Sequence, residues 1–178
     1  MATAPFSQSS PETLVERVIA LLGAISARFG ALESEEWDWI RAHAPSERIV
    51  GLLREATPVS MRVLDAIGRL ERANGSTVAT QSHVPKGTVS KVARRLARQE
   101  LITRDARPNN KKEVFFRLTP LGRELVDFHR EFDALMERGF RTFLARHSAD
   151  ELIVLVNVLD AAVGTSFIQL GEAQAPRD

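Results

Sequence analysis

Residues 76–99 contain two short helical segments that meet at a tight corner, and this pair restricts the possible folds more than any other feature of the chain. The first segment, STVATQSHV (residues 76–84), is long enough for a helix of about two turns. After a corner at His83 and Val84, Pro85 suits the first position of the second helix, because a helix leaves the N–H group that proline lacks unpaired there. Two helices joined in this way are typical of a helix-turn-helix.

A β-hairpin is predicted directly after the second helix. LITRDA (residues 101–106) and EVFFRLT (residues 113–119) are rich in β-branched and aromatic residues, and the polar run RPNNKK between them has the composition of a turn. Val114 and Phe116 share one face of the second strand while Phe115 points to the other, so the hairpin packs on one side only. A helix-turn-helix that continues into a hairpin predicts a winged helix.

The charge of the chain is concentrated in the same region. Residues 85–112 hold nine Lys and Arg side chains but only two acids, a net charge of +7, whereas the rest of the chain sums to −6 and the whole chain to +1. The second helix, within residues 85–99, carries five cations and no acid, although exposed helices usually mix Glu with Lys four residues apart. A locally positive face in a mildly acidic chain indicates a surface for a polyanion, with an ordinary solvated helix face as the alternative.

Four helices are predicted before this region. Capping residues or prolines mark their starts, at Ser10-Pro11, Ser34, Pro45-Ser46 and Pro58. The first helix has a line of apolar side chains along one face up to Phe29. The Asn74-Gly75 pair is expected to end the fourth helix.

Two more helices are predicted after the hairpin, starting at Thr119-Pro120 and at Ser148, which forms a capping box with Glu151. The last helix is apolar on most of its circumference, so we expect it to pack against a second copy of itself, with burial inside one chain as the alternative. The expected fold is mainly α with a small β-hairpin wing. Its expected parts are an N-terminal helical arm (1–57), a winged helix-turn-helix (58–119) and C-terminal dimerisation helices (120–178), forming one intertwined unit.

Most of the stretch from residue 58 to residue 170 resembles the MarR family of winged-helix transcriptional regulators. The resemblance rests on KGTVSKVARRL, the Leu-Ile pair that follows it, a basic wing and then LTPLG, in that order and at the family's spacing. It implies a homodimer that binds double-stranded DNA at a near-palindromic operator as a repressor. It also implies release by a small aromatic or lipophilic effector, although the sequence does not indicate which residues would bind one.

Three positions depart from the family pattern. Ser82 stands where an apolar residue is usual, and His83 stands where a glycine usually makes the corner. At the wing tip, Asn110-Lys111-Lys112 replaces the family's Asp-x-Arg, which removes the carboxylate that normally orients the arginine. We expect three basic residues at this tip, Arg107, Lys111 and Lys112, to lie in the minor groove or on its phosphates.

Helical geometry separates the second helix into an apolar arc and a bare arc, and we expect the bare arc to enter the major groove of DNA. The residues expected at or close to base edges are Lys86, Gly87, Thr88, Ser90 and Lys91. The residues expected on phosphates are Arg94, Arg95 and Arg98. Gly87 would let the backbone come close to DNA, with a simple helix-start glycine as the alternative.

Other classes of function have little support in the sequence. The chain has no cysteine, its four histidines are scattered, and no Gly-rich phosphate loop or paired-carboxylate motif is present, so no enzyme and no cofactor is predicted. Glu35, Glu36, His43 and His129 are read as solvated side chains, although a metal-responsive regulator stays an alternative. A winged helix that contacts proteins instead of DNA is the other alternative.

The expected location is the cytoplasm. The N-terminus lacks a basic start followed by an apolar run, and no segment has 18 uninterrupted apolar residues. Trp37 and Trp39 cannot share a helix face, so we expect one of them in the core and the other at an interface or a cleft.

Overall fold

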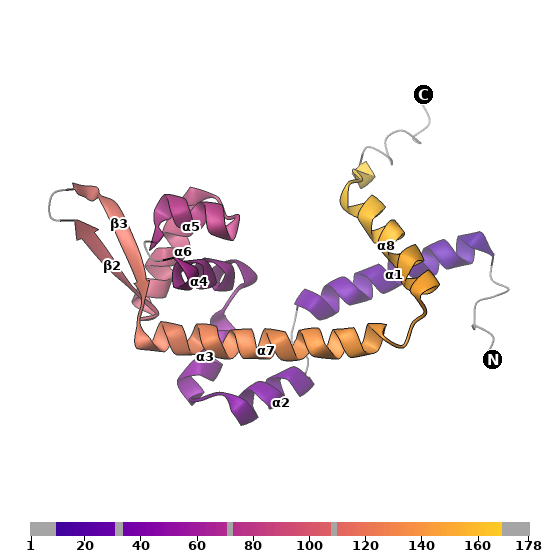
Figure 1. Ribbon diagram of the computed structural model, residues 1–178, viewed down its shortest axis with the longest axis horizontal. Coiled ribbons are helices and arrows are strands. Elements are labelled where there is room, and N and C mark those ends of the chain that lie inside the picture. Colours follow the sequence, from indigo (N-terminus) through magenta and orange to yellow (C-terminus); the bar gives the residue numbers. More distant parts are fainter. Residues whose placement is uncertain (1–9, 31–33, 71–72, 108–109, 169–178) are drawn as a thin grey trace. The chain divides into compact units, whose positions relative to one another are not determined.

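The computed structural model describes residues 10–30, 34–70, 73–107 and 110–168 (Figure 1). The chain forms two compact units, Met1–Phe128 and His129–Asp178. The described elements are α1 (Pro11–Gly30), α2 (Ser34–His43), α3 (Glu47–Glu55), α4 (Pro58–Arg69), β1 (Ala73–Asn74), α5 (Gly75–Ser82), α6 (Lys86–Arg98), β2 (Ile102–Arg107), β3 (Asn110–Leu118), α7 (Pro120–Leu144) and α8 (Ala149–Val163). This mainly helical fold with one small antiparallel sheet confirms the predicted fold class. The predicted division after residues 57 and 119 stays a prediction.

Capping side chains fix where several helices begin. The Ser46 hydroxyl accepts a hydrogen bond from the N–H of Ile49 at the start of α3, as predicted. The start of α4 has a capping box in which Thr57 and Ser60 bond to each other's backbone N–H, with Pro58 in the first turn. These caps pair N–H groups that a helix end leaves free, which explains why the sequence located the starts correctly.

The prediction that Asn74 and Gly75 end the helix before them is wrong. α4 ends at Arg69, and Asn74 begins α5 instead, because its side-chain oxygen accepts hydrogen bonds from the N–H groups of Ser76 (3.0 Å) and Thr77 (2.9 Å). Asparagine serves at both ends of helices, so the pair alone does not fix the direction.

The sheet has the strand order β1-β3-β2, and all its neighbours are antiparallel. The predicted hairpin is confirmed as β2 and β3, in which Ile102 lies opposite Leu118 and Arg104 opposite Phe116. β1 was not predicted. It contributes only two residues, which pair with Phe115 and Phe116 on the other edge of β3, and so short a strand has no alternating pattern to detect.

The core of the first unit lies where α4, α5 and α6 meet the sheet (Figure 1). Each of these elements buries apolar side chains almost completely. They are Val63, Leu64 and Ile67 from α4, Val78 from α5, Val89, Ala93 and Leu96 from α6, and Ile102 and Phe116 from the hairpin. A helix-turn-helix and its wing therefore share one core, which holds α6 rigidly with its other face outward.

The corner between α5 and α6 is made by His83, which has the left-handed conformation (φ 53°, ψ 37°) that glycine adopts most readily. Its N–H bonds back to the carbonyl oxygens of Ala79 and Thr80, so the helix end is satisfied despite a strain of about 1 kcal/mol. The neighbouring Ser82 is buried, and its hydroxyl donates to the Val78 carbonyl at 2.6 Å. Both departures from the family pattern are thus accommodated within the predicted corner.

A short clasp joins the base of the hairpin to the start of α7. The Thr119 N–H donates to the Leu101 carbonyl (3.0 Å), the Thr119 hydroxyl donates to the Glu100 carbonyl (2.6 Å), and the N–H of Gly122 donates to that hydroxyl (3.0 Å). A Cβ atom at Gly122 would lie 1.9 Å from the Leu101 carbonyl oxygen. Only glycine fits there, because the strand and helix backbones are in direct contact.

Neither tryptophan of α2 is buried; Ile40 fills the core there instead. The Trp39 ring stacks on His43 (centroids 4.3 Å apart) and on Phe128 (5.7 Å), and Arg54 lies 5.6 Å from the centre of the Trp37 ring. The expectation that one tryptophan anchors the core is therefore wrong.

In the second unit, α8 begins at the predicted capping box. The Glu151 carboxylate accepts hydrogen bonds from the N–H and the hydroxyl of Ser148, both at 2.8 Å, and these bonds lower the pKa of Glu151 below its usual value. Most apolar side chains of α8 are exposed, including Ile153, Val156 and Leu159. None of the described helices has an apolar stretch sufficient to span a membrane.

Candidate nucleic-acid interface

Helix α6 has the two faces that its sequence predicts. Val89, Ala93 and Leu96 are buried in the core, and Val92 is half-buried beside them. The exposed face carries seven of the predicted contact residues: Lys86, Gly87, Thr88, Ser90, Lys91, Arg94 and Arg98. This face has no carboxylate from α6 itself, so it presents an uninterrupted positive surface.

Gly87 is not required by the packing of the protein. A Cβ atom built at this position meets no other atom within 4 Å, and the backbone there does not have a positive φ. The fold would therefore accept alanine at this position.

Two exposed side chains of α6 form hydrogen bonds with backbone carbonyls of the same helix. The Ser90 hydroxyl donates to the carbonyl of Lys86 (3.1 Å), and the Arg94 Nε donates to the carbonyl of Ser90 (3.3 Å). The hydroxyl oxygen of Ser90 and the terminal nitrogens of Arg94 stay available to a ligand.

Arg95 differs from the other predicted contact residues, because its guanidinium lies against α3. It donates a hydrogen bond of 2.7 Å to the Glu55 carbonyl and lies 3.7 Å from the Glu55 carboxylate, which also accepts from Gln99 (3.0 Å). The structure thus brings Lys91, Arg94 and Arg98 together and places Arg95 apart from them.

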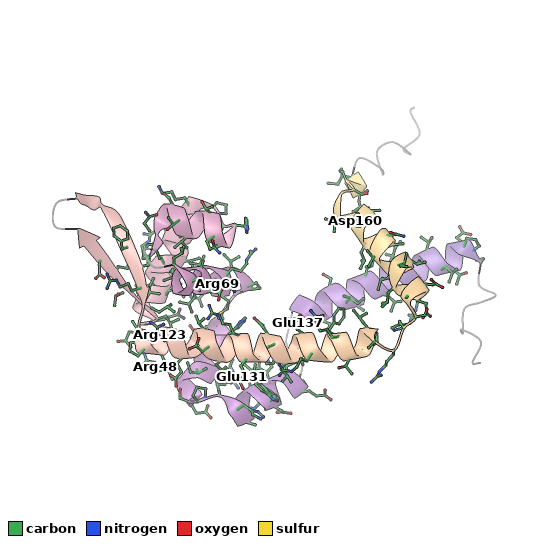
Figure 2. The ribbon with its side chains drawn as sticks, viewed as in Figure 1. Arg48, Arg69, Arg123, Glu131, Glu137 and Asp160 are labelled. Atoms are coloured by element: carbon green, nitrogen blue, oxygen red, sulfur yellow. The ribbon has the colours of Figure 1, made fainter. Side chains whose placement is uncertain are left out.

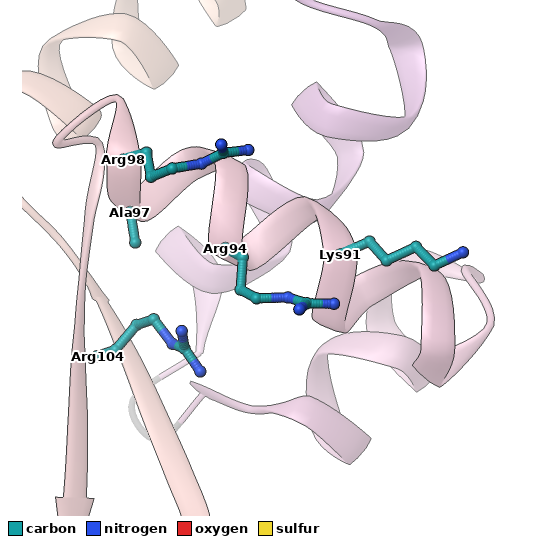
Figure 3. Close-up of a pocket in the computed structure, with 5 residues that line it drawn as sticks. All are labelled: Lys91, Arg94, Ala97, Arg98 and Arg104. Carbon is teal, nitrogen blue, oxygen red and sulfur yellow. The ribbon is translucent and has the colours of Figure 1, made fainter.

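An open cleft of about 670 Å³ lies between α6 and β2. It is lined by Lys91, Arg94, Ala97, Arg98 and Arg104. Figure 3 shows the Arg104 side chain extending from the strand into the space beside the helix. The lining has four cations and no acid, so its electrostatic character suits an anion.

Arg104 was not among the residues predicted to contact DNA. The signal that identifies it is strand alternation, because Arg104 follows the buried Ile102 by two residues and lies opposite the buried Phe116.

The side chains of the predicted wing-tip residues Arg107, Lys111 and Lys112 lie outside the described part of the structure. The backbone of Arg107 pairs with Asn110 after a shift in register that follows Ala106. The predicted roles of these three side chains stay predictions.

Three of the four residues considered for a metal site have other partners. Glu36 lies 3.9 Å from Arg28, a ring nitrogen of His43 lies 2.8 Å from the carbonyl oxygen of Trp39, and His129 lies 2.9 Å from Asp133. Across residues 10–30, 34–70, 73–107 and 110–168, no three His, Asp or Glu side chains are grouped so as to hold a metal ion.

The sequence and the fold of this chain are both similar to those of known helix-turn-helix proteins. The MarR family model matches residues 56–114. The chain is 32% identical over 106 residues to the HTH-type transcriptional regulator PchR of Bacillus subtilis and 31% identical over 103 residues to the uncharacterised HTH-type transcriptional regulator YhjH of the same organism. The alignments cover 60% and 58% of this chain, and the chain spans only 63% and 59% of the two regulators.

A solved structure of Streptococcus pneumoniae FabT in complex with DNA has the same fold. Its TM-score to this chain is 0.57 at 21% identity, covering 90% of this chain and 99% of that one. The proteins named here are transcriptional regulators or share their fold, and none is described as an enzyme. The family match, the related sequences and the winged helix described above agree, and residues 56–114 form a MarR-family winged helix-turn-helix.

Proposed function

We propose that this chain is a DNA-binding transcriptional regulator that reads duplex DNA with α6. The observation that carries the proposal is the exposed face of α6, which is positive along its whole length while the opposite face is locked into the core. A helix held in this way and free of acidic side chains suits the negatively charged major groove.

The contacts divide by position along α6. Lys86, Thr88, Ser90 and Lys91 lie in the first half of the helix, where a recognition helix meets base edges, and Gly87 between them brings the backbone close. Arg94 and Arg98 lie one and two turns farther on and contact phosphates. We leave Arg95 out of the DNA-contacting set, because its guanidinium already bonds to Glu55.

The regulator acts as a homodimer in this proposal. α1 and α8 each expose long apolar surfaces, including Val15, Ile19, Val156 and Leu159. Exposed apolar surface of this extent in a helical chain marks a protein interface. A two-fold dimer would place two copies of α6 in successive major grooves, so the operator is a near-palindrome with half-sites about 10 base pairs apart.

Regulation by a small aromatic or lipophilic effector completes the proposal, with the chain acting as a repressor until the effector binds. The stack of the half-buried Trp39 on the exposed His43 and the buried Phe128 supports this part, because stacked rings offer a surface for another ring. Both tryptophans of the chain lie in α2, so binding near the stack changes the intrinsic fluorescence.

The test is selection of genomic DNA fragments with the purified full chain, followed by titration of the recovered duplex at several salt concentrations. We expect one recurring near-palindromic sequence and an affinity that falls by roughly 10³-fold between 50 and 200 mM salt if about six phosphates are contacted. A winged helix that contacts proteins would recover no recurring sequence, and its weak binding to DNA would show no preference.

A further inference from the structure

We infer that the cleft between α6 and β2 seats a phosphate group of the DNA backbone, and that Arg104 is a DNA-positioning residue. This inference rests on the proposed function and names a contact that belongs to neither the helix nor the wing tip. It assigns a role to a residue of the edge strand β2, where the helix and the hairpin that we propose to contact DNA meet.

The backbone geometry of β2 directs Arg104 toward α6. Opposite residues of an antiparallel pair lie on the same face of a sheet, so Arg104 shares its face with Phe116, and Ile102 shares it with Leu118. Ile102 and Phe116 are buried, whereas Arg104 is exposed because it lies where this core face opens into the cleft. The guanidinium is therefore held at the mouth of the cleft by a strand that the core fixes.

No acid neutralises the cleft. Within the described part of the chain, Lys91, Arg94, Arg98 and Arg104 have no carboxylate within 4 Å. The two acids nearest in sequence are engaged elsewhere, since Glu100 pairs with Arg48 and Asp105 lies 3.8 Å from Arg117 on the other face of the sheet.

Four like charges that line one cleft repel one another, and an anion between them removes that repulsion. A phosphodiester can be such an anion, because its two free oxygens accept hydrogen bonds from several guanidinium and ammonium groups at once. The volume of about 670 Å³ admits such a group together with its sugar.

The position of the cleft agrees with the course of DNA in a winged-helix complex. When α6 lies in the major groove and the wing reaches the next groove, the sugar-phosphate backbone that separates the two grooves passes between helix and hairpin. The cleft opens at this place, between the exposed face of α6 and β2 (Figure 3).

The experiment compares Arg104→Met with a matched control, Arg117→Met. Arg117 lies on the adjacent strand, opposite Thr103, so the control removes the same charge from the same hairpin but from the opposite face. Both variants and the wild type are titrated with the duplex recovered by selection, at several salt concentrations, after their melting temperatures have been compared.

We expect Arg104→Met to lower the affinity about tenfold and to reduce the slope of log affinity against log salt by about one, as for the loss of one phosphate contact. Arg117→Met should change the slope by much less, and Arg104→Lys should restore most of the loss. If Arg104→Met lowers the melting temperature, its loss of affinity no longer tests the phosphate contact. The affinity and salt slope of Arg104→Lys are then compared with those of the wild type, because this variant keeps the charge and the aliphatic stem.

A second arm locates the phosphate. Neutral methylphosphonate linkages are introduced one at a time into the duplex, and each duplex is titrated with the wild type and with Arg104→Met. We expect one linkage that weakens the wild type but has no further effect on the variant, since the two changes remove the same contact.

The outcomes separate the two hypotheses. Wild-type protein that selects no sequence overturns the proposed function itself. The role of Arg104 is overturned if Arg104→Met and Arg117→Met change DNA binding equally and the effects of Arg104→Met and of every methylphosphonate linkage simply add. The proposed function still stands in that case, provided that the wild type binds its selected duplex with steep salt dependence.

Discussion

The Arg95 guanidinium of α6 donates a hydrogen bond to the main-chain carbonyl of Glu55, the last residue of α3, at 2.7 Å. Gln99 adds a second bond to the Glu55 side chain at 3.0 Å, and Arg48 of α3 pairs with Glu100 just beyond the end of α6. α3 thus holds the C-terminal end of the helix that we propose to enter DNA. Arg95 serves that attachment.

Replacing Arg95 with Met should therefore affect the protein differently from replacing Arg98. The Arg95 side chain is 42% exposed, so its bonds to Glu55 contribute no more than about 1 kcal/mol to the free energy of unfolding. We expect Arg95→Met to lower stability by up to that amount and to leave the salt slope of DNA binding unchanged. Denaturant unfolding and salt titration measure the two effects; a slope reduced by about one would place Arg95 on a phosphate after all.

Lys91 and Arg98 should differ in what they contribute to specificity. Lys91→Ala should weaken binding to the operator far more than binding to random duplex, because we propose that Lys91 contacts base edges. Arg98→Ala should weaken both alike, because phosphates are present in every sequence. Competition titrations with the two duplexes measure this, and equal losses for both variants on both duplexes would contradict the assignment.

Gly87→Ala separates folding from binding. Since a Cβ atom there meets nothing within the protein, the variant should be as stable as the wild type or more stable by up to about 1 kcal/mol. If the backbone of Gly87 approaches DNA, the affinity should nevertheless fall. A stable variant with unchanged affinity would show that Gly87 is only a helix-start residue.

The wing tip should act through charge alone. Changing Lys111 and Lys112 together to Ala should weaken DNA binding by roughly 1 to 3 kcal/mol without altering the preferred sequence. The reason is that Asn110-Lys111-Lys112 stands here in place of the family's oriented arginine. Repeating the selection with the double variant checks this. A changed preference at the flanks of the operator would mean that the tip reads the groove.

A charge in α8 should disrupt the proposed dimer without unfolding a single chain. The side chain of Val156 is 61% exposed in the single chain, so Val156→Asp costs little there, but burial of the charge in a dimer interface would cost roughly 3 to 5 kcal/mol. Leu159→Asp should behave in the same way. Operator binding should be lost with either variant, although neither residue touches DNA.

The matched control is Asn157→Asp, which adds the same charge at an exposed polar position of α8, about 100° around the helix from Val156 and one turn before Asp160 (Figure 2). It should leave self-association intact. Sedimentation at micromolar concentration decides: a monomeric wild type, or a dimer that survives Val156→Asp, would contradict the proposed interface.

The sequence located elements whose boundaries have a local cause. Ser46, Thr119 and Ser148 mark helix starts because their hydroxyls accept N–H groups of the first turn, and the predicted hairpin follows from alternation along β3. The two faces of α6 follow equally from the helical repeat.

Other features depend on partners that are distant in sequence. Arg95 lies about 60° around the helix from Val92, at the border between the two faces, and only the position of Glu55 decides where it points. The two residues of β1 become a strand because β3 lies beside them, and Arg104 gains its neighbours through the packing of β2 on α6. Local periodicity carries none of these relationships.

The clasp at Thr119 and Gly122 limits which substitutions the chain can tolerate. The Leu101 carbonyl occupies the space that a β-carbon at position 122 would need. Every substitution of Gly122 therefore displaces the backbone at Leu101 and the backbone of α7 together. Exposed residues of α7 can be replaced without such a clash, but the buried Gly122 cannot. In a genetic screen for mutants that no longer regulate their target genes, substitutions of Gly122 should recur, although we propose no DNA contact for this residue.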